Sequence, residues 1–199
     1  MIKAVVFDFG QVLVHFVPKY MVERYVPAGE DATLLEEVVF DRTYWDRLDA
    51  GTITNEQTLA ECHKRLPERL WAVADKIYYN WIYNIPEIDG MREVVMWLKG
   101  RVPLYLLSNI SNYFAEHAHE VPILSLLDGC VFSAPIGIVK PSREIFAHLC
   151  DKFNLVPEET LFVDDNAGNI KGAGEFGIKA YHFDGDASKL LEYLKSVIK

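Results

Sequence analysis

Short runs of β-branched and other apolar residues alternate with helical patterns over much of this chain, and this alternation limits the possible folds. The runs lie at residues 5–7, 104–107, 130–132, 161–163 and 180–183. They are apolar at successive positions, as strands of a parallel sheet covered on both faces must be. We therefore expect an α/β fold, with a Rossmann-like, doubly wound parallel sheet of about five strands.

Residues 16–86 contain no convincing strand but several consecutive helical stretches. Thr54 and Gln57 fit a capping box at the start of one of them. A helical block placed directly after the first strand of such a sheet is typical of a cap domain. We expect a core domain at 1–15 and 87–199 and an inserted cap domain at 16–86, with most aromatic rings of the cap packed inside it.

The 199-residue chain has a formal net charge of −9 and three widely spaced cysteines, and no apolar run is long enough to span a membrane. Nucleic-acid binding relies on Lys and Arg to neutralise phosphates, so the acidic balance argues against a nucleic-acid partner. The cysteines have no metal-binding spacing and fit a reducing compartment. We expect a cytoplasmic protein without a membrane partner, either a monomer or a weak homodimer.

Polar side chains with catalytic potential follow the predicted strands at one edge of the sheet. They are an acid, a hydroxyl with an amide, a cation and a carboxylate pair: Asp8, Ser108 with Asn109, Lys140, and Asp164 with Asp165. Each alone also fits a helix cap or a turn. Ligands of open parallel sheets bind at the carboxyl ends of the strands, so the common position of these residues predicts one site.

Three carboxylates in one cleft repel each other, and a hard divalent cation such as Mg²⁺ relieves that repulsion by taking oxygen ligands. With the metal and Lys140 in place, a phosphate dianion could approach Asp8. Ser108 and nearby backbone N–H groups could hold the phosphoryl oxygens. The residues therefore favour phosphate chemistry assisted by magnesium.

Four motifs, FDFGQVL, LYLLSN, GIVKPS and FVDDNAGNIKGA, occur in this order along the chain. Together they resemble the haloacid dehalogenase-like hydrolase superfamily, over the whole chain, with residues 16–86 at the place of the helical cap. Within that superfamily the chain is most similar to sugar phosphatases of the glucose-1-phosphatase type and to the N-terminal phosphatase domain of soluble epoxide hydrolases. The resemblance implies a magnesium-dependent phosphatase for a small phosphomonoester, and we expect a sugar phosphate.

The resemblance also implies roles for single residues. Asp8 would be the nucleophile that forms an aspartyl-phosphate. Ser108 and the Asn109 backbone would bind the transferring phosphoryl group, and Lys140 would balance its charge. The same resemblance implies a magnesium site made of the Asp8 carboxylate, the Gly10 carbonyl oxygen and Asp165, with Asp164 close by and Asn169 in an outer position.

Gly10 departs from the family pattern, because many members carry there an aspartate that protonates the leaving group and then activates water. General acid–base catalysis contributes roughly 10² to 10⁴-fold in rate. An activated leaving group would need little protonation, and the sugar phosphatases that the chain resembles also have glycine here. Otherwise His15, or Asp46 or Asp49 in the cap, could supply the proton.

Three other functions compete with a phosphatase. A 2-haloacid dehalogenase uses an aspartate nucleophile without a metal, but such a site has no need for the pair Asp164 and Asp165. A phosphorylated receiver domain has these residue types in another order. A phosphosugar-binding or regulatory protein of low activity would follow if Gly10 had removed turnover.

Residues 172–177 spell the GxGxxG pattern of dinucleotide-binding folds. There the pattern starts at a strand-to-helix turn, whereas here it lies well inside a helix that begins near Ala167. We expect no dinucleotide cofactor. Gly172 and Gly174 are instead expected to let the helix pack close to the sheet, and Gly177 to end it.

Overall fold

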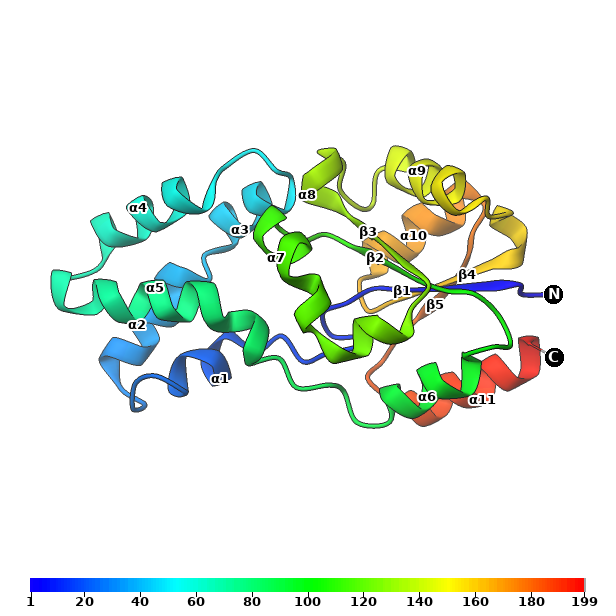
Figure 1. Ribbon diagram of the computed structural model, residues 1–199, viewed down its shortest axis with the longest axis horizontal. Helices are drawn as coiled ribbons and strands as arrows, with labels where there is room; N and C mark the ends of the chain where they lie inside the picture. The colour runs from blue at the N-terminus through cyan, green and yellow to red at the C-terminus, as the bar shows by residue number, and fades with distance from the viewer. Residues whose placement is uncertain (199) are drawn as a thin grey trace.

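Five parallel strands form one sheet in the computed structural model, which describes residues 1–198. The strand order is β3-β2-β1-β4-β5 (Figure 1). The strands are β1 (Ala4–Phe7), β2 (Leu104–Ser108), β3 (Gly129–Phe132), β4 (Thr160–Asp164) and β5 (Lys179–His182). Phe7 pairs with Leu106 on one side and with Val163 on the other, so the three central strands end nearly level. The prediction of an α/β fold with about five parallel strands is confirmed.

Helices cover both faces of the sheet (Figure 1). Helices α6 (Met91–Leu98) and α11 (Ala187–Val197) pack together on one face, and α9 (Arg143–Phe153) and α10 (Ala167–Phe176) on the other. Side chains of β1 alternate between the two apolar cores: Val5 and Phe7 belong to one, and Val6 to the other. The central strands are therefore buried on both faces.

The expectation that all five strands are apolar on both faces is wrong for the two edge strands, β3 and β5. Lys179 and His182 of β5 are exposed, and β3 is mostly half-buried. Each edge strand has a neighbour on one side only, so fewer atoms cover it.

The glycines of α10 also differ in part from expectation. A Cβ at Gly172 would lie 2.7 Å from the carbonyl oxygen of Pro141. This glycine therefore allows α10 to pack closely against the segment before α9, and not against the sheet. A Cβ at Gly174 would meet no other described part of the chain within 4 Å, so this glycine makes no close contact with the sheet. Gly177 has a φ of +109° and ends the helix as expected.

The segment after β1 forms helices beyond the carboxyl ends of the strands (Figure 1). They are α1 (Pro18–Glu23), α2 (Glu30–Val39), α3 (Arg42–Asp49), α4 (Asn55–Arg65), α5 (Trp71–Asn80) and the 3₁₀ turns Glu68–Leu70 and Trp81–Tyr83. Thr54 and Gln57 form the capping box predicted for α4. The division into a core domain and a cap domain at 16–86 stays a prediction.

The remaining short elements connect the strands. They are α7 (Asn112–His117), α8 (Ser133–Ile136) and the 3₁₀ turns Ala118–Glu120, Pro122–Leu126 and Pro157–Glu159. Within residues 1–198, none of the helices has both the length and the apolar character that crossing a membrane requires.

A chain of aromatic contacts joins the sheet to the helices that follow β1. The Phe114 ring of α7 lies 4.7 Å from the Phe9 ring and stacks on the Trp81 ring at 5.4 Å, measured between centroids. Trp81 in turn contacts Phe16 and Trp45. One apolar core therefore runs from the sheet into the helical segment.

We expect Phe114→Ala to lower the free energy of unfolding by about 3–5 kcal/mol, because Phe114 is 0% exposed and its removal leaves a cavity. Chemical denaturation measures this change. Tyr20→Ala, at a residue 42% exposed, serves as control and should change the stability little. Equal effects of the two substitutions would contradict the proposed packing.

Candidate active site

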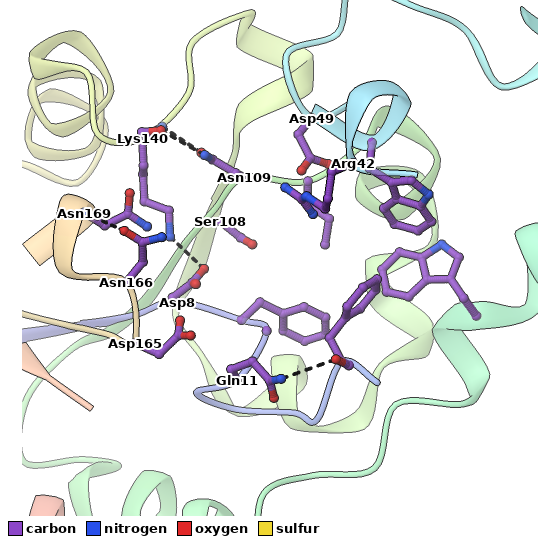
Figure 2. Close-up of a pocket in the computed structure, with 16 residues that line it drawn as sticks. Asp8, Gln11, Arg42, Asp49, Ser108, Asn109, Lys140, Asp165, Asn166 and Asn169 are labelled. Atoms are coloured by element: carbon purple, nitrogen blue, oxygen red, sulfur yellow. Dashed lines mark hydrogen bonds and ion pairs between the residues drawn. The ribbon is translucent and has the colours of Figure 1, made fainter. Parts of the chain in front are cut away.

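The carboxyl ends of β1, β2 and β4 bring the expected polar residues to one cavity. Asp8 follows β1, Ser108 ends β2 and Asp165 follows β4. Strand order reverses at β1, which is where open α/β sheets bind ligands. All three residues and Lys140 line a cavity of about 270 Å³ (Figure 2). Gly10 lines the same cavity.

Lys140 reaches into this site from the loop after α8. Its Nζ atom lies 2.7 Å from Oδ1 of Asp8 and 2.8 Å from Oδ2 of Asp164. The Lys140 side chain is only 1% exposed, and the ammonium lies 5.3 Å from the centroid of the Phe162 ring. A buried charge is tolerated when it is paired, and here two carboxylates pair with it.

The charges of this group shift one another's pKa values. Burial raises the pKa of Asp8 to about 6; Lys140 opposes this rise and Asp164 adds to it. Burial also works against the charge of Lys140, but the two carboxylates outweigh it and raise the pKa of the ammonium. Lys140 therefore stays charged at neutral pH.

Amide side chains hold Lys140 and its partner Asp164 in place. Asn109 Nδ2 donates to the Lys140 carbonyl oxygen at 3.0 Å, and the Lys140 backbone N–H donates to Asn109 Oδ1 at 2.7 Å. Asn169 Nδ2 lies 3.2 Å and 3.0 Å from the two Asp164 oxygens. The Asp164 carboxylate also accepts a hydrogen bond from the Asn166 backbone N–H. The sequence had not revealed that the Asn109 and Asn169 side chains support Lys140.

The donor set fits a hard divalent cation. Carboxylate oxygens of Asp8, Asp164 and Asp165 lie within 4.8 Å of one another. Three carboxylates against one ammonium leave an excess of negative charge, which Mg²⁺ would neutralise. Asp164 is fully buried and already bonded to Lys140 and Asn169, so it suits a supporting position. Asp8, Asp165 and the Gly10 backbone remain as the residues that would hold the metal.

The position of Gly10 has room for a side chain. A Cβ at this position would lie 3.7 Å from the Phe16 Cβ, an ordinary contact.

Three other residues were candidates to supply the proton. His15 is exposed and does not line the cavity. Asp46 is also outside the cavity lining, and its carboxylate pairs with Arg42. Asp49 does line the cavity.

Aromatic rings form the wall of the cavity opposite the carboxylates. Phe16, Trp45 and Trp81 line it, and the Trp45 and Trp81 rings lie 5.5 Å apart, centroid to centroid. Both tryptophans are buried, so they serve the apolar core and the cavity wall together.

A family model described as a haloacid dehalogenase-like hydrolase matches residues 2–177. The chain belongs to this family, which confirms the resemblance found in the four motifs. A D-ribitol-5-phosphate phosphatase from Bacteroides thetaiotaomicron is 25% identical over 190 residues, which cover 91% of each chain. The family and this relative confirm the prediction of an enzyme, a hydrolase of the phosphatase kind.

Solved structures have the same fold. A HAD-like family hydrolase from Porphyromonas gingivalis superposes with a TM-score of 0.75 at 24% identity, covering 99% of this chain and 98% of that one. A HAD family enzyme from Bacteroides thetaiotaomicron, in complex with magnesium and inorganic phosphate, superposes with a TM-score of 0.72 at 20% identity. That alignment covers 96% of this chain and 99% of the other.

We expect Lys140→Met to lower the free energy of unfolding by about 3–5 kcal/mol, because it leaves the buried Asp164 and the half-buried Asp8 without their cation. Denaturant titration measures the loss. Lys189→Met is the matched control, since Lys189 pairs with Asp184 on the surface and its loss should matter little. A stability of Lys140→Met equal to that of the control would contradict this account.

Binding of Mg²⁺ is expected to weaken about tenfold for each pH unit below about pH 6, because metal binding requires a deprotonated ligand. Asp8, with its pKa raised by burial to about 6, binds a proton in that range and then cannot ligate. Isothermal titration calorimetry between about pH 5 and about pH 7 measures the effect. An affinity that does not change with pH would argue against Asp8 as a ligand.

Proposed function

We propose that this protein is a magnesium-dependent phosphatase that hydrolyses a small phosphomonoester, a sugar or polyol phosphate, through an aspartyl-phosphate on Asp8. The observation that carries the proposal is the Asp8 carboxylate in a cavity, 2.7 Å from a buried ammonium and beside Asp165. A lone carboxylate would repel a phosphate dianion. The ammonium and a bound cation remove that repulsion.

In the proposed first step, an Asp8 oxygen attacks phosphorus, and the bond from phosphorus to the ester oxygen breaks. Lys140 balances the charge on Asp8 and on the transferring group, and its pairing with Asp164 fixes its position. Ser108, buried at the end of β2, donates its hydroxyl to a phosphoryl oxygen. Water then cleaves the aspartyl-phosphate. Mg²⁺, when bound, supplies further charge neutralisation at the phosphoryl oxygens.

The cavity supports a small ester as substrate. About 270 Å³ leaves room for a compact molecule, not for a polymer. Its walls combine the Trp45 and Trp81 rings with the polar side chains of Gln11 and Arg42. Rings and polar groups together suit a carbon chain that carries hydroxyls. The relative that acts on D-ribitol 5-phosphate supports this class.

Further parts of the proposal concern the protein as a whole. Residues 16–86 act as a cap over a core made of 1–15 and 87–199. The three cysteines are free, which supports a reducing compartment such as the cytoplasm. We propose a monomer or weak homodimer whose partner is the substrate, with no nucleic acid or membrane involved.

A screen for phosphate release from small phosphomonoesters, with Mg²⁺ and with a chelator, tests the function. We expect release by the wild type with Mg²⁺, and a loss of at least about 10³-fold in Asp8→Asn or with chelator. Asp184→Asn, at a surface carboxylate paired with Lys189, is the control and should keep full activity. Halide release from a 2-haloacid without metal, or phosphate release by Asp8→Asn at the wild-type rate, would overturn the proposal.

A further inference from the structure

The buried carboxylate of Asp49 lies at the proposed active site, and no described residue pairs with it. Asp49 ends α3, is 8% exposed and lines the same cavity as Asp8, from the opposite side (Figure 2). Among residues 1–198, no group forms a hydrogen bond or ion pair with its carboxylate. Buried carboxylates are normally bonded, so one that opens into a cavity points to a ligand there.

The backbone of Asp49 is fixed to the sheet. Ser133 Oγ donates to the Asp49 carbonyl oxygen at 2.5 Å and accepts from the Ile110 N–H at 2.8 Å. Ile110 comes two residues after Ser108, so the contact ties the end of α3 to the end of β2. Gly51, with φ of +67°, allows close approach as well, since its Cβ would be 2.5 Å from the Ala134 oxygen. The Asp49 backbone is thus held at a set position relative to Ser108.

The surroundings of Asp49 keep a proton available near neutral pH. Burial raises its pKa to about 7. Arg42 opposes this rise and Asp46 adds to it; across the cavity, Asp8 adds and Lys140 opposes. A group that titrates near the working pH can both give and take a proton.

We propose that Asp49 is the general acid and base of the reaction, in place of the side chain that Gly10 lacks. This inference rests on the proposed function. As the bond from phosphorus to the ester oxygen breaks, Asp49 gives its proton to that oxygen, and the alcohol leaves. The Asp49 carboxylate then takes a proton from water while the water oxygen attacks phosphorus. The Asp8 oxygen leaves phosphorus, and free phosphate, the Asp8 carboxylate and protonated Asp49 result.

A different role for the same residue would be to bind a substrate hydroxyl. Such a role predicts a change in KM that depends on the hydroxyl and not on the leaving group. An acid role predicts a loss of rate that depends on the leaving group and not on the hydroxyl, because a poor leaving group needs the proton and a good one does not. Two esters without further hydroxyls separate these roles: an alkyl phosphate with a poor leaving group, and 4-nitrophenyl phosphate with a good one.

The experiment compares wild type, Asp49→Asn and Asp184→Asn on both esters, with Mg²⁺ present. Asp49→Asn should lower kcat/KM for the alkyl phosphate by about 10² to 10⁴-fold and for 4-nitrophenyl phosphate by less than about tenfold. The wild-type rate on the alkyl phosphate should fall above about pH 7, and this fall should be absent in Asp49→Asn. Asp184→Asn, at a surface carboxylate outside the cavity lining, should behave as wild type.

Retained activity on 4-nitrophenyl phosphate shows that Asp49→Asn is folded. Equal losses on both esters, or no loss on either, would overturn the acid and base role. If the wild type hydrolyses 4-nitrophenyl phosphate and Asp8→Asn does not, the proposed function stands whatever Asp49→Asn does. If the wild type releases no phosphate from any ester, the proposed function and this inference fail together.

Discussion

The ammonium group of Lys140 holds together two carboxylates that would otherwise repel each other inside the protein. Asp8 and Asp164 follow or end neighbouring strands, β1 and β4, so the parallel sheet itself brings their charges close. Burial makes this arrangement costly unless the cation is present. Asp164 anchors the lysine, while Asp8 also lines the cavity.

The supports of Lys140 come from separate parts of the chain. Asn109 fixes its backbone, Asn169 fixes the Asp164 carboxylate, and the Phe162 ring lies beneath the ammonium. The opposite wall comes from α3 and its neighbours, which share an apolar core with the sheet through Phe114. The cavity therefore lies between a charged wall built on strand ends and an aromatic wall built on helices.

The sequence predicted the sheet and the convergence of its polar residues at one edge, because both depend on local patterns. Apolar runs define strands, and a polar residue directly after a run must lie at the strand end. The sequence could not reveal that Asn109 clamps Lys140, since the pairing joins residues 31 positions apart. Nor did the sequence show that Asp49 lines the cavity and Asp46 does not. One signal was present: Arg42, Trp45 and Asp49 are spaced as one helix face, and all three line the cavity.

Direct detection of the covalent intermediate tests the central claim most sharply. The protein is mixed with a phosphomonoester and Mg²⁺, quenched in acid, digested and examined by peptide mass spectrometry. We predict one phosphoryl group on the peptide that contains Asp8, and none in Asp8→Asn. Phosphate release with no label on that peptide, or a label located on another residue, would contradict the account.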